Sequence, residues 1–228
     1  MSWYDAVADD YEAWSGQVSG DTAFYTDLAR GVDGPIVELA VGDGRVAIPL
    51  ARELGRSVIG IDNSPGMLAR AHQEAESAGV ALDLRLGDMA DLELEEPAGL
   101  IYCPARALLH IPTWAERRRL FERVAQALRP GGRFAWNVFA FHHHLAVELD
   151  GVHQGLPSPH VSRYSIAENR VDIELDSGEI TSLWWATKNE WLGLIDVAGL
   201  ELEHTFGDFG GGPLLDDSTE YVFVTRRR

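Results

Sequence analysis

The sequence predicts a doubly wound α/β fold with a mostly parallel seven-stranded sheet, an N-terminal helical cap and a small antiparallel insertion. Short apolar strands alternate with helical segments from residue 36 to residue 139, the pattern of repeated strand–helix–strand units. The last of these strands, residues 133–139, is apolar almost throughout, as expected of a strand covered by helices on both faces. A glycine-spaced turn at residues 42–44 joins the first strand to its helix.

Length and composition favour one domain in four segments. A chain of 228 residues with 46% hydrophobic content is long enough to bury one ordinary core. Apolar residues recur at intervals of three and four near the N-terminus, as in amphipathic helices: Trp3, Val7, Tyr11 and Trp14. We expect the four segments to be a helical cap (1–33), a ligand-binding core (34–140), an inserted flap (141–187), and a closing helix with two strands (188–228).

Capping signals set the boundaries in the core. Ser64 followed by Pro65 predicts a helix start, and Gly79 predicts where that helix ends. Thr113 and Glu116 have capping-box spacing for a second helix. Its inward residues are expected to be Leu120, Phe121, Val124 and Leu128. The five strands of the core are predicted at residues 36–41, 57–61, 82–86, 99–103 and 133–139.

The remainder of the chain departs from strand–helix alternation. Three strand patterns, at residues 161–164, 171–175 and 180–185, predict an antiparallel flap, with residues 176–178 as a hairpin turn. A helix over residues 188–198 and strands near residues 202–206 and 221–225 then complete the main sheet. Loops and flaps over a scaffold choose the ligand, so we expect the cap and the flap to determine specificity.

Charge and cysteine content exclude several partners. A net charge of −17 repels phosphate backbones and anionic lipids, so we expect neither nucleic acid nor a membrane as a partner. The basic run at residues 117–119 lies in a predicted helix and is expected on a solvated face, with partners such as Glu122. One cysteine, Cys103, and an N-terminus without a signal-peptide pattern favour a soluble cytoplasmic protein.

Carboxylates surround the turn after the first strand. Gly42 and Gly44 allow the backbone to approach a ligand closely, and with Ala47 they also fit a dinucleotide fingerprint. Glu38 and Asp43, however, place negative charge where a pyrophosphate would be bound. The turn therefore favours a cationic ligand.

The next two strands also end in acids. Asp62 lies about twenty residues after the glycines, where an acid can accept hydrogen bonds from ribose hydroxyls. Asp88 follows the third strand and could accept from an adenine amino group, with Met89 beside the ring. Because the carboxyl ends of parallel strands share one edge of the sheet, the three acids predict a nucleoside site.

These motifs resemble those of the class I S-adenosylmethionine-dependent methyltransferases. The ordered set is Glu38-x-Ala40-x-Gly42-x-Gly44, Asp62, Gly87-Asp88-Met89 and Leu128-Arg-Pro-Gly-Gly132, and the resemblance covers roughly residues 1–226. It implies that Glu38 and the turn hold the methionine moiety, Asp62 the ribose, and Asp88 with the Met89 backbone the adenine. It also implies that Asn63 and Met67 line the adenine pocket and that Tyr11 closes over the cofactor. Ala40 and Asp43 depart from the family pattern, which favours a glycine and a small hydroxyl or thiol residue there.

The charge argument agrees with this resemblance. S-adenosylmethionine carries a sulfonium and an ammonium group and no phosphate, so carboxylates attract it. We therefore expect methyl transfer to a small-molecule acceptor, leaving S-adenosylhomocysteine. The alternatives are an NAD-type dehydrogenase and a non-catalytic S-adenosylmethionine-binding interaction protein. A homodimer is left open.

A catalytic base is optional for such a transfer, because the methyl group is already activated by positive sulfur. The candidates are His110 after the fourth strand, His143 in the run of residues 142–144, and Tyr164. A lone histidine among apolar residues, as at His110, is more often structural. Three adjacent histidines suit tetrahedral ligation poorly, so we expect a surface loop there and no metal.

Overall fold

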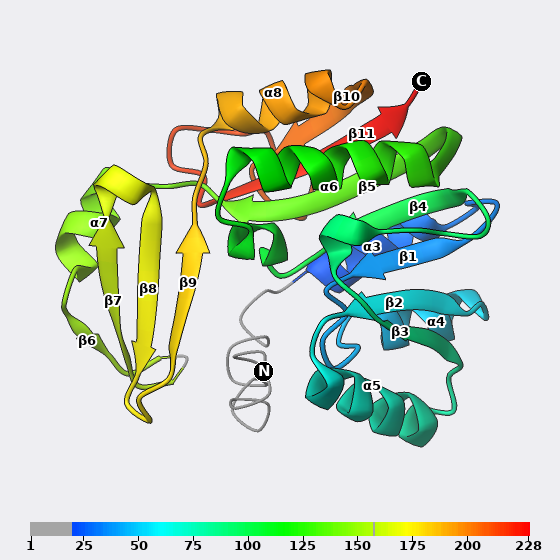
Figure 1. Cartoon of the computed structure of the whole chain (residues 1–228), viewed down its shortest axis with the longest axis horizontal. Helices are drawn as coiled ribbons and strands as arrows, with labels where there is room; N and C mark the ends of the chain where they lie inside the picture. The colour runs from blue at the N-terminus through cyan, green and yellow to red at the C-terminus, as the bar shows by residue number, and fades with distance from the viewer. Residues whose placement is uncertain (1–19, 157) are drawn as a thin grey trace.

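The main sheet of the computed structural model, which describes residues 20–156 and 158–228, has the predicted seven strands (Figure 1). Their order is β10-β11-β5-β4-β1-β2-β3; β11 runs antiparallel to both β10 and β5, and the other adjacent pairs are parallel. The strands are β1 (Ile36–Leu39), β2 (Val58–Asp62), β3 (Leu82–Leu86), β4 (Ala98–Cys103), β5 (Leu128–Phe139), β10 (Leu200–Phe206) and β11 (Glu220–Arg227). The doubly wound fold class is confirmed.

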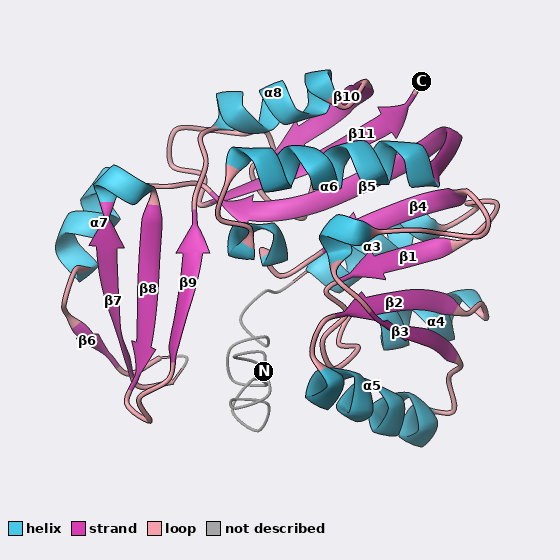
Figure 2. Ribbon diagram, viewed as in Figure 1, coloured by secondary structure: helices cyan, strands magenta, loops and turns pink. Residues whose placement is uncertain are grey.

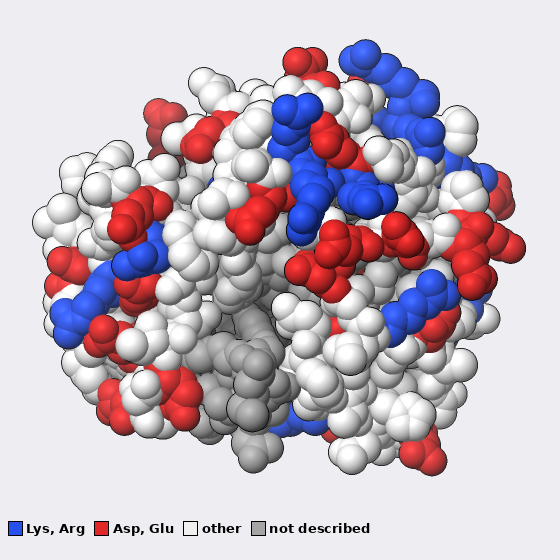
Figure 3. Space-filling view, viewed as in Figure 1, with Lys and Arg blue, Asp and Glu red and all other residues white. Residues whose placement is uncertain are grey.

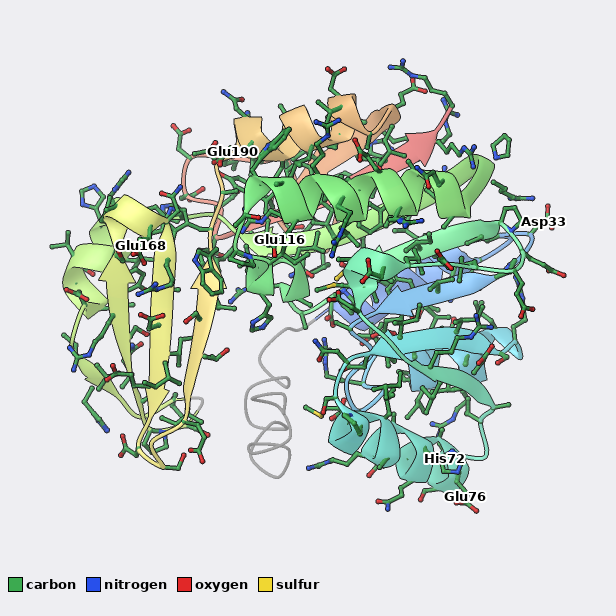
Figure 4. All side chains as sticks on the ribbon, in the orientation of Figure 1. Asp33, His72, Glu76, Glu116, Glu168 and Glu190 are labelled. Carbon is green, nitrogen blue, oxygen red and sulfur yellow. The ribbon has the colours of Figure 1, made fainter. Side chains whose placement is uncertain are left out.

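Helices cover both faces of this sheet (Figure 2). On one face lie α3 (Asp21–Ala29), α4 (Ala47–Leu54) and α5 (Pro65–Ala78), and on the other lie α6 (Trp114–Ala127) and α8 (Lys188–Val197). On α5, His72 and Glu76 point away from the sheet (Figure 4), while Ala71 and Ala75 are buried against it. This is the period expected of an amphipathic helix.

The helix boundaries follow the capping signals with one exception. The Ser64 hydroxyl accepts from the Met67 amide at 3.1 Å, and Gly79 ends α5 at a φ of 66°. Thr113 caps α6 in the same way. The Glu116 carboxylate accepts from the Thr113 hydroxyl at 2.6 Å, so the reciprocal bond of the predicted capping box is not made there. A complete capping box occurs instead at α8, between Thr187 and Glu190.

An aromatic core fills the face under α6 and α8. Its rings stack or meet edge to face at centroid distances from 4.7 to 6.4 Å. The members are Phe121, Phe134, Trp136, Trp191 and Phe223, and none is exposed to solvent. Of the predicted inward residues of this helix, Leu120, Phe121 and Val124 lie in the core on α6, whereas Leu128 is buried there as the first residue of β5, because α6 ends at Ala127. Burial of this size is the main stabilising contribution of the fold.

The basic run on α6 divides into a buried and an exposed part. Arg118 pairs with Glu122 at 2.7 Å on the solvated face, as predicted. Arg117, by contrast, is only 5% exposed, so the prediction of a solvated side chain is wrong for this residue. The helical period places residue 117 one turn before Leu120 and Phe121, on the side that faces the sheet.

The flap is a separate four-stranded antiparallel sheet, inserted between β5 and α8 (Figure 1). The three predicted strands are present as β7 (His160–Ser165), β8 (Arg170–Leu175) and β9 (Ile180–Trp184). The sequence pattern missed a short strand, β6 (His153–Gln154), and a helix, α7 (His143–Leu149). The histidine run is therefore the start of a helix, and the predicted surface loop is wrong. No capping side chain marks this start, and Ala146 is the buried residue that packs α7 into the fold.

Most of the predicted cap, including Tyr11, lies outside the described residues, and α3 is the part of it that is described. Within the described ranges, no helix is long and apolar enough to cross a membrane. No group of three or more His, Cys, Asp or Glu side chains in those ranges is arranged to hold a metal. On the face shown in Figure 3, basic side chains lie beside acidic ones. Among the ion pairs of the described residues, Arg119 lies 3.6 Å from Asp91 and Arg123 lies 3.6 Å from Glu93.

Candidate active site

Glu38 is a buried carboxyl at the centre of the sheet edge. It is 1% exposed on β1 and faces Tyr102 on the neighbouring strand β4. The Tyr102 hydroxyl donates to its Oε2 at 2.7 Å. Burial raises the pKa of Glu38 to about 8, although the Tyr102 hydrogen bond and the charge of Arg45 oppose this shift. A cation placed beside this buried carboxyl would stabilise its ionised form.

The turn after β1 is left-handed at three alternate residues. Ala40, Gly42 and Gly44 have φ angles of 55°, 56° and 85°. Glycine adopts this region without strain, whereas an alanine there costs about 1–2 kcal/mol. A side chain at Gly44 would place its Cβ 2.8 Å from Ile48 Cδ1. The family pattern favours glycine at residue 40, so this chain keeps the turn at the expense of backbone strain.

Asp62 links the first two strand ends. It is 8% exposed, and its Oδ2 accepts from the Gly42 amide while its Oδ1 accepts from the Ser64 amide, both at 2.9 Å. Asp62 thus fixes the glycine turn at the end of β1 and the start of the segment that leads into α5.

Asp43 and Arg45 determine the charge beside the turn. The Asp43 carboxylate accepts from the Arg45 amide at 3.2 Å, and burial raises its pKa. The Arg45 guanidinium donates to both oxygens of the buried Asp21 on α3, at 2.9 and 2.5 Å. Because this cation is paired with a carboxylate, the turn offers a poor site for a pyrophosphate.

The third strand end lies beside the second. The Gly87 amide donates to the Asp62 carbonyl at 2.9 Å. Asp88 is exposed, and one of its oxygens caps a short 3-10 helix, η1 (Met89–Asp91), through the Ala90 amide at 2.8 Å. Of the two residues expected to line an adenine pocket, Asn63 is exposed, whereas Met67 is 1% exposed in the first turn of α5.

The three candidate bases lie in two places. His110 ends η2 (Ala107–His110), which follows β4, and burial lowers its pKa to about 4 despite a hydrogen bond to the Ser182 backbone on β9. His143 and Tyr164 both lie around Phe141, with ring centroids 5.0 and 6.3 Å from it. Burial raises the pKa of Tyr164, so its phenol stays protonated at neutral pH.

The sequence did not predict a chain of hydrogen-bonded polar side chains at the same edge of the main sheet. Tyr25 on α3 stacks on Tyr102 at 5.0 Å and donates to Asn137 Oδ1 at 3.2 Å. Asn137 donates to Glu220, which also accepts from Arg106. The hydrogen bonds of this chain join residues more than eighty positions apart, and Arg106 adopts a left-handed backbone with a φ of 62°. A single sequence does not indicate such long-range pairs.

Comparison with known proteins agrees with this geometry. Residues 36–132 match a family model described as a methyltransferase domain. The CcbJ methyltransferase of Streptomyces caelestis is 25% identical, with a TM-score of 0.76 over 92% of this chain and 95% of that chain. An S-adenosylmethionine-dependent methyltransferase of Clostridium acetobutylicum is 14% identical and shares the fold, with a TM-score of 0.82 over 99% of each chain.

A carboxy-S-adenosyl-L-methionine synthase of Yersinia enterocolitica is 31% identical over 102 residues, which are 42% of this chain and 37% of that protein. The matches to this protein and to another curated relative span 37% and 59% of the relatives' lengths. The strand order and the glycine turn define a Rossmann-like α/β protein. Residues 36–132 are similar to the methyltransferase-domain family, and the fold is similar to that of S-adenosylmethionine-dependent methyltransferases, which supports S-adenosylmethionine as the cofactor.

Proposed function

We propose that this protein transfers the methyl group of S-adenosylmethionine to a small-molecule acceptor. The observation that carries the proposal is the row of acids at three adjacent strand ends, Glu38, Asp62 and Asp88, around a glycine turn whose neighbouring arginine is already paired. In this proposal Glu38 and the turn face the methionine moiety, Asp62 the ribose hydroxyls, and Asp88 the adenine amino group.

The cofactor supplies an activated methyl group, so the chain's own contribution is positioning and the exclusion of water. His110, with a pKa of about 4, is neutral at physiological pH and orients an acceptor without holding its proton. The Tyr164 phenol remains protonated and acts as a donor. The proposal therefore favours an acceptor that reacts through a lone pair already present, such as a neutral amine.

Specificity in this proposal comes from the flap. It stands at the end of the main sheet beyond η2, and β9 meets η2 through His110 and Ser182. The position of the flap supports an enclosed site of a size suited to a small molecule. The net charge of −17 favours encounter with neutral or cationic acceptors, because it repels anions.

A screen of small amines and hydroxyl compounds with S-adenosylmethionine labelled in the methyl group tests the proposal. We expect labelled product with at least one acceptor class, formed together with S-adenosylhomocysteine. Cofactor binding without turnover on any acceptor, combined with cofactor-dependent association with another protein, would instead identify a non-catalytic interaction protein.

A further inference from the structure

Arg117 is a buried arginine whose hydrogen bonds go to two different parts of the chain. It is 5% exposed on α6, and its Nε donates to the Ile111 carbonyl at 3.0 Å. One of its terminal nitrogens donates to the Trp184 carbonyl. Its guanidinium carbon lies 4.9 Å from the centroid of the Trp191 ring.

The charge of Arg117 persists in this environment. Burial lowers its pKa to about 10, and the opposing charge of Glu190 only partly offsets this effect, so the guanidinium is cationic at neutral pH. Figure 4 shows Glu190 at the start of α8 and Glu116 at the start of α6, the helix ends nearer the flap. A buried cation is costly, and hydrogen bonds donated by the charged group offset part of that cost.

The two carbonyls belong to segments that meet at the flap. Ile111 directly follows His110 at the end of η2, and Trp184 is the last residue of β9. His110 itself bonds to the Ser182 backbone two residues earlier on β9. The Arg117 guanidinium and the His110 imidazole thus both connect the segment after β4 to β9.

A second contact closes the root of the flap. Phe141, just after β5, stacks on Trp185, just after β9, at a centroid distance of 4.0 Å and an interplanar angle of 7°. The Trp185 amide donates to the Asn169 carbonyl at 2.8 Å. The chain entering the flap and the chain leaving it are therefore packed face to face.

We propose that Arg117 is a positioning residue for methyl transfer: it fixes the flap against the segment after β4 and so holds His110 in the wall of the acceptor site. The inference rests on the proposed function for the identity of that wall. These contacts hold the root of the flap in place as a wall of the acceptor site. Arg117 connects the flap to the segment after β4 and does not touch the acceptor.

The test compares Arg117→Met with Arg118→Met, a matched change on the exposed neighbour that pairs with Glu122. The pKa of His110 is measured from its ring-proton NMR shift, and hydrogen exchange is followed at β9 and η2. In Arg117→Met we expect the His110 pKa to rise by at least about one unit toward 6.5, with faster exchange in both segments. Arg118→Met should leave both as in the wild type, and both variants should bind S-adenosylhomocysteine within about twofold of it.

Arg117→Lys keeps the charge and is used if Arg117→Met does not fold. Its ammonium lacks the planar fork of arginine, so we expect a smaller rise in the His110 pKa. Once an acceptor is known, Arg117→Lys should lower kcat without changing the KM for S-adenosylmethionine. A wild-type His110 pKa near 6.5, or no change in pKa and exchange in the folded variant, would overturn the proposal. Neither readout requires turnover, so failure here is distinct from failure of the proposed function.

Discussion

The edge formed by β1, β2 and β3 and the region around the flap are built in different ways. At the three strand ends, the bonds of two of the acids lie close in sequence: Asp62 reaches Gly42, twenty residues away, and Asp88 caps its own turn, whereas Glu38 is held by Tyr102, 64 residues away. Around the flap, Arg117 reaches Trp184, 67 residues away, and Phe141 meets Trp185. The proposed cofactor edge is thus shaped mainly by backbone turns, whereas the proposed acceptor wall is shaped by tertiary packing.

This difference predicts that the two regions respond separately to mutation. A change in the packing of the flap root should alter the acceptor wall and leave the cofactor edge intact. A change in the acids or the turn should do the reverse.

The largest effect is expected for Trp185→Ala. Trp185 is 5% exposed and stacked on Phe141, and truncating a buried tryptophan costs about 3–5 kcal/mol. Chemical denaturation should show this loss, while the folded variant still binds S-adenosylhomocysteine. Trp114→Ala is the control, since Trp114 is 44% exposed and should cost much less. An equal loss in the two variants would contradict the account of the flap root.

A smaller effect is expected for the pH dependence of S-adenosylmethionine binding, through ionisation of Glu38. In the free protein its carboxyl stays protonated up to a pKa of about 8, but a cationic cofactor favours the ionised form. Between pH 5.5 and 7, binding of S-adenosylmethionine should release up to one proton, so affinity should rise by at most about tenfold per pH unit. Calorimetry in two buffers of different ionisation enthalpy measures how many protons are released on binding. Glu38→Gln should abolish this release. Equal proton release in both proteins would refute the assignment.

The raised pKa of Glu38 also makes the free energy of unfolding depend on pH. Because the pKa of Glu38 is raised on folding, the folded state binds a proton that the unfolded state loses above its usual 4.5. The contribution is fully present below pH 4.5 and is lost as pH rises through about 8. Glu38→Gln should therefore flatten the decline in stability over this range.

The smallest effect is expected for Ala40→Gly. Relief of the left-handed strain, about 1–2 kcal/mol, is partly offset by about 0.4–1 kcal/mol of added unfolded-state entropy. We expect a net gain of up to about 1.6 kcal/mol in the free energy of unfolding. Ala69→Gly, on the exposed face of α5, should instead lose about 1 kcal/mol, because its backbone is helical. A loss at both positions would show that residue 40 is not strained.

The sequence predicted features that depend on neighbouring residues and missed those that depend on distant contacts, in both regions. Ser64, Gly79 and the strands of the main sheet were predictable because capping and apolar periodicity act within a few residues. The burial of Arg117, by contrast, depends on a carbonyl in the flap, and that of Glu38 on a hydroxyl 64 residues away. Helix α7 was missed because no capping side chain marks its start, and α7 is held by the packing of Ala146.

Binding of S-adenosylhomocysteine to wild type, Asp62→Ala and Asp83→Ala, measured by calorimetry alongside thermal unfolding, tests the central claim most directly. Asp83 is an exposed acid on β3 and serves as the matched control. Loss of charge-assisted bonds to ribose should weaken binding to folded Asp62→Ala at least about tenfold and leave Asp83→Ala unchanged. Equally tight binding to Asp62→Ala and wild type would contradict the placement of the cofactor at these strand ends.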